Sequence, residues 1–281
     1  MKVKTLFFTL SISFLFASCT TLNKLNDLSP LPVENLSLSE LCPSNPDWET
    51  IAPGFQTTSY KISSLNITWH CAKIDFETAG TDLSINYFIN AKNDTYSLKK
   101  FAGKTHSIVA INTTPFKNKE KSNQTVGIVK AEKNIYSECK ENYSALAFSK
   151  NSENIYQCKI LENQNKNEIE KYEYAFGGFY QILQDGKILS FNKSRRSRTA
   201  CATNSEGNIL YLFATTPVFS LTDQNGLTYE ECAIILKNLG CTDAMQFDGG
   251  HSTALIINQK NAEKPFMQRK VAAGIGFGLS D

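Results

Sequence analysis

The chain has 281 residues, including 29 Lys and Arg, 27 Asp and Glu, and a formal net charge of +2 at pH 7. A charge so close to neutral, without a basic stripe interleaved with aromatic residues, argues against nucleic acid as a partner. The 8 cysteines and 3 histidines show no spacing typical of a structural zinc site. The length suits one globular domain with a sizeable core, so function has to be sought in short motifs.

The first residues predict export. Lys2 and Lys4 precede an apolar run, Leu6–Phe16, that is too short to span a bilayer permanently. Small residues then stand directly before Cys19, as in a bacterial lipobox, so residues 1–18 are predicted to be a lipoprotein signal peptide. Acylation of Cys19 would anchor the chain to a bacterial cell-envelope membrane. The alternative is an ordinary signal peptide with an incidental cysteine.

The remaining chain divides into two predicted parts. Residues 19–55 are polar, contain prolines and lack long periodic apolar runs, so they are predicted to be a tether. Residues 56–281 form the predicted globular domain. Disulfides can form outside the cytoplasm, and Cys42–Cys71 and Cys139–Cys158 are the favoured pairs, although sequence leaves the connectivity open.

Short strands dominate the middle of the chain. Leu83–Ile89 alternates apolar and polar residues, which predicts a half-buried strand. Ser107–Ile111 predicts a second strand that ends at Asn112, where asparagine is most often a turn former. Apolar runs on both sides of Asp185-Gly186 predict a hairpin. Further strands are predicted at 199–203 and 209–214.

A capped helix and a glycine corner follow. Thr228 and Glu231 form a capping box, and the helix is predicted over Tyr229–Leu239, ahead of Gly240. Two buried strands, 244–247 and 254–257, then flank the sequence Asp248-Gly249-Gly250-His251-Ser252-Thr253. A plain β-hairpin turn has the same appearance. A nucleophile elbow at Ser252 is excluded, because no histidine follows it to act as the base.

The pattern predicts an α+β fold, built on a twisted, mostly antiparallel sheet with packed helices. Residues 225–253 resemble the hallmark segment of the phosphodiester glycosidase family, roughly G-L-T, a helix ending in L-G, and D-A-x-N-L-D-G-G-G-S-S. Weaker similarities precede it in the right order: an asparagine at a strand end (Asn112) and R-T-A at Arg198. The resemblance implies a single phosphodiester-glycosidase-like domain.

The resemblance also implies a reaction, the hydrolysis of a sugar-1-phosphodiester at the glycosidic bond to give a free sugar and a phosphomonoester. Arg198 would grip the phosphate together with the main-chain amides of Gly249 and Gly250. Ser252 and Thr253 would donate further hydrogen bonds. Asp248 would be the catalytic carboxylate or would orient the sugar.

Asn112 would bind sugar hydroxyls. Three further assignments stay open, and the first is Gly178, which would line the site or have a purely conformational role. A second carboxylate is usual in glycoside hydrolysis, and Asp243, Asp185 and Asp223 are the candidates. His251 replaces the family's third glycine. It is either an acid or base, as its ordinary pKa near 6.5 allows, or a tolerated substitution that reshapes substrate choice.

Two other functions compete with the enzyme: an envelope lipoprotein that binds phosphorylated glycans through the same pocket without turnover, and a structural lipoprotein in which the corner is only a turn. The latter predicts no pocket around Asn112, Arg198 and Asp248. The Asp248 carboxylate and its neighbouring hydroxyls suit a divalent cation, but no ligand spacing requires one. No cofactor or metal site is therefore assigned. The expected partners are a glycan or sugar-phosphate substrate and, through Cys19, a membrane.

Overall fold

The computed structural model describes residues 35–89, 95–119, 122–189, 194–217, 226–262 and 269–280. These residues belong to one compact unit, which extends from Glu34 to Asp281. The predicted signal peptide and Cys19 lie outside the described residues. Within the described ranges, no helix combines the length and the apolar character that a membrane crossing requires.

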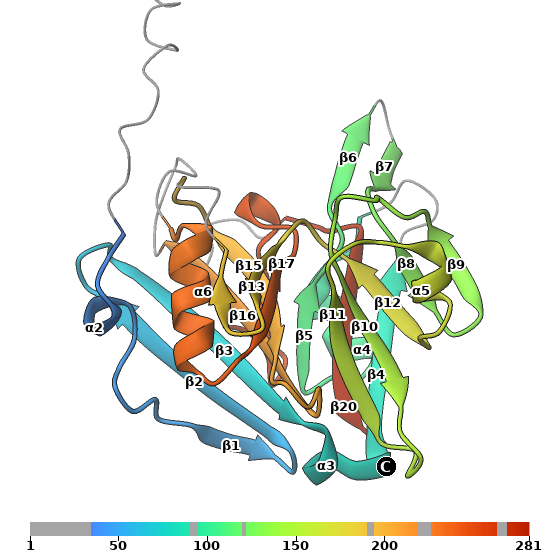
Figure 1. Cartoon of the computed structure of the whole chain (residues 1–281), viewed down its shortest axis with the longest axis horizontal. Coiled ribbons are helices and arrows are strands. Elements are labelled where there is room, and N and C mark those ends of the chain that lie inside the picture. Colours follow the sequence, from blue (N-terminus) through green and yellow to red (C-terminus); the bar gives the residue numbers. More distant parts are fainter. Residues whose placement is uncertain are drawn as a thin grey trace, which may run out of the picture. The chain divides into compact units, whose positions relative to one another are not determined.

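The largest element of the fold is an eight-stranded sheet in which every neighbouring pair is antiparallel (Figure 1). Its strands, in spatial order, are β1 (Glu49–Ala52), β2 (Phe55–Ile62), β3 (Ile67–Asp75), β16 (Ile209–Pro217), β15 (Arg198–Thr203), β17 (Asp243–Gln246), β13 (Gln181–Gln184) and β14 (Lys187–Ile188). The predicted hairpin around Asp185 is confirmed as β13 and β14.

Two five-stranded antiparallel sheets complete the framework. One has the order β11 (Tyr156–Leu161), β10 (Ala145–Lys150), β12 (Tyr174–Gly177), β8 (Val129–Ala131) and β9 (Asn134–Ser137); the other has β19 (Lys260–Asn261), β18 (Leu255–Ile257), β5 (Val109–Asn112), β20 (Ala273–Leu279) and β4 (Leu83–Ile89). A two-stranded ribbon joins β6 (Phe116–Lys119) to β7 (Ser122–Thr125). The prediction of mostly antiparallel pairing with few helices is confirmed, but the strands form several sheets instead of one.

The main core lies where the three large sheets meet. It includes Ile74 from β3, Phe148 from β10 and Phe277 from β20, all completely buried. The rings of Phe148 and Phe277 lie 5.9 Å apart between centroids, which is ordinary aromatic contact. Burial of apolar side chains from all three sheets joins them into one folding unit.

The helices are short, and among the described α-helices only α6 (Tyr229–Asn238) contributes a residue, Tyr229, to the candidate site described below. They are α2 (Leu38–Leu41), α3 (Phe76–Ala79), α4 (Leu98–Lys104), α5 (Lys166–Ile169) and α6 (Tyr229–Asn238), with 3₁₀ turns η1 (Gly80–Asp82) and η2 (Gly250–Ser252). The predicted capping box is confirmed: Glu231 N donates to Thr228 Oγ1 at 3.1 Å, and Thr228 N donates to Glu231 Oε2 at 2.9 Å. The apolar stripe of α6 is buried against the eight-stranded sheet.

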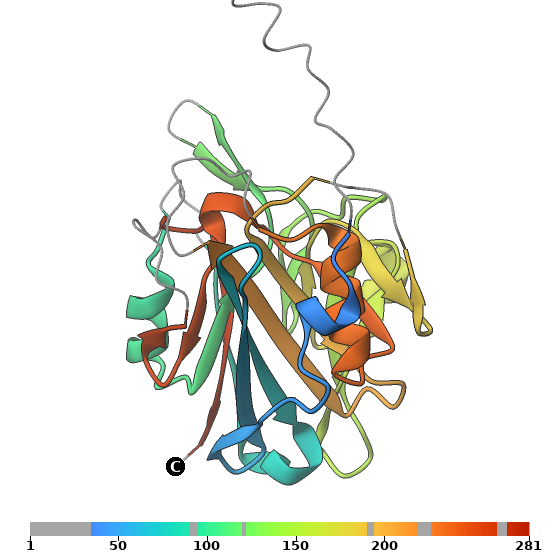
Figure 2. The same cartoon turned by 90° about the vertical axis from the view of Figure 1, so that its left-hand side faces the viewer.

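The predicted tether is wrong from residue 35 onward, because residues 35–55 belong to the compact unit. Leu41 is completely buried, and its carbonyl accepts a 2.8 Å hydrogen bond from Trp69 Nε1. Leu36 N donates to Glu231 Oε1 at 3.1 Å. Figure 2 shows α2 beside α6 on one face of the eight-stranded sheet. The segment of residues 35–55 has too few apolar residues to show a periodic pattern, but those such as Leu41 are buried in the core.

The predicted disulfides are also absent, since all seven cysteines in the described ranges are free thiols. Cys42 Sγ accepts a hydrogen bond from Asn238 Nδ2 at 3.1 Å. Cys158 Sγ donates to Thr203 Oγ1 at 3.3 Å, in the main core, whereas Cys139 packs beside a different cluster under α5. Cys42 and Cys71 share one core cluster, whereas Cys139 and Cys158 lie in separate environments that sequence spacing does not reveal.

Candidate functional site

The turn at residues 248–253, called the Asp248 corner below, connects a strand of one sheet to a strand of another. β17 belongs to the eight-stranded sheet, whereas β18 pairs with β5 in a five-stranded sheet. Between them, Asp248 N donates to the Thr113 carbonyl at 2.9 Å, and Gly250, at φ +59°, opens the 3₁₀ turn η2. The plain-hairpin interpretation is therefore wrong, because the two strands do not pair with each other.

Asn112 holds this corner in place from the end of β5. Its Nδ2 donates to the Asp248 carbonyl at 2.7 Å, and its Oδ1 accepts from Ala254 N at 2.9 Å and Thr199 Oγ1 at 3.2 Å. The side chain is 1% exposed. The prediction that Asn112 contacts sugar hydroxyls gives way to a positioning role, since its hydrogen-bonding groups are directed at the protein.

A cavity of about 270 Å³ opens beside the corner. Strand, turn and helix residues line it together: Phe179, Arg196, Arg198, Tyr229, Gln246, Phe247, Asp248, Gly249 and Gly250. Arg198 and Asp248 thus share one cavity, and Asn112 bonds directly to the corner that forms its wall. The structural-lipoprotein interpretation predicted no such pocket.

Arg198 is held rigidly at the start of β15. Its Nε donates to the Leu227 carbonyl at 2.7 Å and its Nη2 to the Ser194 carbonyl at 2.5 Å. The guanidinium carbon lies 4.2 Å from the centre of the Tyr229 ring, a cation–π contact. Burial lowers the pKa of Arg198, yet an arginine remains cationic at physiological pH. The cavity therefore contains a preoriented positive charge.

Asp248 supplies the carboxylate of the cavity. Burial raises its pKa from 3.8 to about 6, against the smaller opposing effects of a Ser252 hydrogen bond and the charge of Arg269. Near pH 6, a carboxyl with such a pKa is present in both its protonated and its ionised form. It can therefore give up or accept a proton close to neutral pH, as general acid–base catalysis requires. Ser252, 3% exposed, thus acts on Asp248 directly.

The predicted amide cradle is formed only in part. Gly250 N donates to the Ser197 carbonyl at 2.9 Å, so this amide is directed at the protein and not at an anion. Gly249 approaches Ser197 so closely that a Cβ would lie 2.8 Å from its carbonyl oxygen, which explains the need for glycine there. Thr253 Oγ1 is buried with no hydrogen-bond partner in the described part of the chain. Both glycines line the cavity, but the paired-amide role is wrong for Gly250.

His251 is exposed in the middle of η2 and does not line the cavity. Its backbone φ is not positive, so the side chain replaces glycine without strain. This geometry favours the tolerated-substitution alternative over a catalytic imidazole.

Gly178 has a packing role. A Cβ there would lie 2.3 Å from the Gln246 carbonyl oxygen and 2.4 Å from Met245 Cε. Its amide donates to the Ser144 carbonyl at 2.9 Å, and the next residue, Phe179, reaches the cavity instead. The conformational alternative for Gly178 thus fits the structure.

Sequence reasoning missed five residues of the cavity wall: Phe179, Arg196, Tyr229, Gln246 and Phe247. Gln246 is 1% exposed and its Nε2 has no hydrogen-bond partner in the described ranges. Gln246 could have been predicted from the sequence. Side chains two residues apart on an extended chain point to the same side, so Gln246 is expected on the same side as Asp248. Tyr229 is the first residue of α6, and nothing in its local sequence indicates the contact with Arg198.

The two arginines just before the Arg198 segment have different environments. Arg196 is exposed at the rim of the cavity. Arg195 instead forms a bidentate ion pair with the completely buried Glu231, at 2.8 Å and 2.5 Å. Because Glu231 also caps α6, this pair fastens the Arg198 segment to the helix.

Neither of the two described candidates for a second carboxylate lines the cavity. Asp243 and Asp185 line a different cavity, and Asp223 lies outside the described residues. Among the residues that line the Asp248 cavity, Asp248 is the single carboxylate. Within the described ranges, no three His, Cys, Asp or Glu side chains are grouped so as to hold a metal ion.

The chain belongs to the phosphodiester glycosidase family, whose sequence profile matches residues 105–278. That range contains Asn112, Arg198, Asp248 and the whole cavity wall. The search of curated proteins gave no match.

Solved structures share the fold at low sequence identity. A hypothetical protein from Synechocystis matches with a TM-score of 0.60 and 14% identity over 80% of this chain, which spans 62% of that protein. The zebrafish N-acetylglucosamine-1-phosphodiester alpha-N-acetylglucosaminidase catalytic domain, auto-inhibited by its pro-peptide, has a TM-score of 0.62 and 15% identity over 83% of this chain and 85% of that one. A putative exported protein from Burkholderia pseudomallei has a TM-score of 0.57 and 10% identity over 75% and 74%. These likenesses establish the fold.

Proposed function

We propose that this protein hydrolyses a sugar-1-phosphodiester at the glycosidic bond and releases the free sugar and a phosphomonoester. The observation that carries the proposal is the cavity in which the buried Arg198 and the pKa-shifted Asp248 lie together, in a chain of the phosphodiester glycosidase family. The zebrafish relative bears the name of an enzyme acting on N-acetylglucosamine-1-phosphodiesters. We further propose that the protein is exported and anchored through Cys19 to a bacterial cell envelope.

Arg198 and the rim residue Arg196 attract the phosphodiester anion into the cavity. Arg198 donates to two carbonyls and also to the Tyr229 side chain, and these bonds fix the direction of the N–H groups that are left for a phosphate oxygen. Phe179, whose ring lies 5.4 Å from that of Tyr143, offers an apolar face for a sugar ring.

Asp248 in its ionised form then takes a proton from a water molecule. The water oxygen bonds to the anomeric carbon as the bond from that carbon to the phosphate oxygen breaks. A phosphomonoester is a better leaving group than an alcohol, and Arg198 stabilises the charge that it carries away. Strong acid assistance is thus unnecessary, and one carboxylate suffices. Turnover should rise with pH as Asp248 ionises near its pKa of about 6.

The alternative is a lipoprotein that binds phosphorylated glycans without turnover. The observation that favours it is the single carboxylate in the cavity wall, where glycoside hydrolysis usually has two.

The deciding experiment measures free sugar released from UDP-N-acetylglucosamine and from a simple N-acetylglucosamine-1-phosphodiester. The expected result is release by the natural protein and a loss of at least about 100-fold in Asp248→Asn, with folding intact by circular dichroism. Equal release in both proteins would refute the role of Asp248. Absence of release, together with sugar-phosphate binding that requires Arg198, would favour the binding protein.

A further inference from the structure

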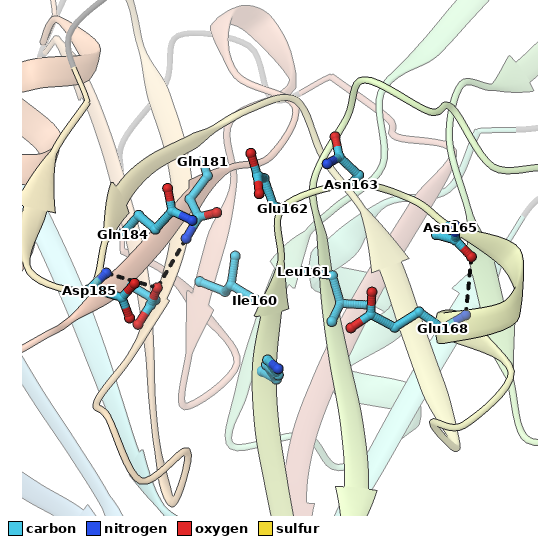
Figure 3. A pocket seen from close by; sticks show the side chains of 11 residues that line it. Ile160, Leu161, Glu162, Asn163, Asn165, Glu168, Gln181, Gln184 and Asp185 are labelled. Carbon is cyan, nitrogen blue, oxygen red and sulfur yellow. Dashed lines mark hydrogen bonds between the residues drawn. The ribbon is translucent and has the colours of Figure 1, made fainter.

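A second cavity lies at the other end of β17. It has a volume of about 480 Å³ and opens between β11 with the segment leading to α5 on one side and β13 with its turn on the other (Figure 3). Asp243 begins β17 and lines this cavity, whereas Asp248 follows the same strand and lines the first one. The two cavities share no lining residue.

The walls of the second cavity are polar and negatively charged. Carboxylates come from four positions on both sides: Glu162, Glu168, Asp185 and Asp243. Lys159 is the single cationic residue of the lining. The remaining polar groups include the side-chain amides of Gln181 and Gln184, which Figure 3 shows facing Glu162 across the opening. The excess of carboxylates disfavours an anion and favours a cation.

Gln181 gives an independent indication of a ligand. It is 6% exposed, and its Nε2 donates to Asp243 Oδ1 at 3.0 Å. This bond fixes the orientation of the amide, because only the nitrogen can donate to a carboxylate. Asp243 is itself held by Asp185 N at 3.3 Å and by Thr242 Oγ1 at 2.9 Å. The opposite atom, Gln181 Oε1, is itself buried and has no hydrogen-bond partner in the described ranges.

An unpartnered buried carbonyl oxygen destabilises the folded protein, and a ligand that donates a hydrogen bond to it would recover that loss. The ligand must therefore donate hydrogen bonds and carry positive charge. A bare metal ion fits poorly, because no three acidic, histidine or cysteine side chains of the described chain are grouped around one point. A protonated amine meets both requirements, since an ammonium group has three donors and no acceptor.

We infer that this cavity is a binding site for a small ligand that carries a protonated primary amine. The ammonium group pairs with Gln181 Oε1 after a small side-chain adjustment, and the surrounding carboxylates balance its charge. An amino sugar and a polyamine share this chemistry. The inference does not depend on the proposed hydrolase activity, because the cavity lies apart from Arg198 and Asp248.

Isothermal titration of the full-length protein with glucosamine and with spermidine tests the inference. N-acetylglucosamine is the matched control for glucosamine, since acetylation removes the positive charge and leaves the ring. Binding of either amine, absent for N-acetylglucosamine and weakened by salt, is the expected result. The stronger of the two amines identifies the source. Failure of both amines to bind would overturn the proposal, and water would then be the partner of Gln181 Oε1.

Variants locate the binding. Glu162→Gln and Glu168→Gln each remove one negative charge from the cavity, and each should weaken amine binding about threefold. Glu170→Gln, on an exposed residue just beyond α5 that does not line the cavity, should leave it unchanged. Gln181→Met keeps the volume and removes the acceptor, so binding should fall at least about tenfold. Binding that survives these changes but disappears in Asp248→Asn would place the amine in the first cavity and overturn the proposal.

Discussion

Asn112 Nδ2 donates a 2.7 Å hydrogen bond to the main-chain carbonyl of Asp248, 136 residues further along the chain. Asn112 ends β5 in a five-stranded sheet, whereas Asp248 follows β17 of the eight-stranded sheet. One amide group thus joins the two sheets at the edge of the candidate site. The position of the Asp248 carboxylate depends on this link.

Asn112→Ala should therefore reduce stability and activity together. The change leaves the Asp248 carbonyl and Ala254 N without their buried partner, at a cost of about 2–3 kcal/mol in the free energy of unfolding. Urea denaturation measures the loss. Asn167→Ala, on an exposed residue of α5, is the control and should change stability by less than about 0.5 kcal/mol. Similar values for both variants would contradict the positioning role.

Asp248→Asn should stabilise the protein in a pH-dependent way. The pKa of Asp248 is about 6 in the folded state, above its ordinary 3.8, so the folded state holds the proton more tightly. Stability of the natural protein therefore falls as pH rises through this window, and asparagine escapes that loss by up to about 3 kcal/mol. Denaturation at pH 3.5 and pH 7 should show the gain at pH 7 alone. A gain of equal size at both values, or one matched by the exposed Asp47→Asn, would contradict the pKa shift.

Arg198→Lys should impair turnover of the charged substrate despite keeping the charge. Lysine cannot donate to the Leu227 and Ser194 carbonyls while also gripping phosphate, so kcat/KM should fall about 10- to 100-fold. Arg196→Gln, at the exposed rim, should cost less than about fivefold, and its effect should vanish in high salt. Equal losses in the two variants would argue against a clamp at Arg198.

Gly178→Ala should destabilise the fold by about 1–3 kcal/mol, because the new methyl group meets the Gln246 carbonyl and Met245. Gly103→Ala is the matched control. Gly103 lies inside α4 with no atom within 4 Å of its added Cβ, so alanine should be neutral or stabilising by up to about 1 kcal/mol. Thermal unfolding of both proteins distinguishes steric from general effects. A harmless Gly178→Ala would show that the wall behind Phe179 is adaptable.

His251→Gly should preserve or raise sugar release, since the exposed imidazole does not line the cavity. The measurement is kcat with the same phosphodiester at several pH values. A collapse of turnover with unchanged folding would instead assign an acid or base role to His251.

Local signals predicted the elements around the site well. The capping box fixed the start of α6, and the predicted strand Leu83–Ile89 coincides with β4. Other strand ends shift by one to three residues: the predicted Ala244–Phe247 is found as β17 at Asp243–Gln246, and the predicted strand 209–214 as β16 at Ile209–Pro217. These features depend on neighbours in the chain, and their residue types are visible in the sequence.

Long-range partners could not be predicted. The Gly250 amide donates to the Ser197 carbonyl, and Arg195 pairs with Glu231. Both contacts join residues 195–197 to residues more than 30 positions later in the chain, because the order of strands in the sheet brings these segments together. Sheet order depends on the packing of many strands at once, and no short motif encodes it. The role of Asn112 changed for the same reason, and the choice between the two alternatives for Gly178 also needed the fold. The residue types indicated which segments contribute to the site, but they did not indicate which polar groups face the cavity.

The segment of residues 35–55 sets a limit on how this protein can be shortened. Leu41 fills the core beside α6, and Leu36 N bonds to the same glutamate that anchors Arg195. A protease that cuts within this segment would therefore open a hydrophobic surface on the helix whose first residue, Tyr229, supports Arg198. Shortening the chain past Leu36 and Leu41 would thus loosen the wall of the candidate cavity as well as the core.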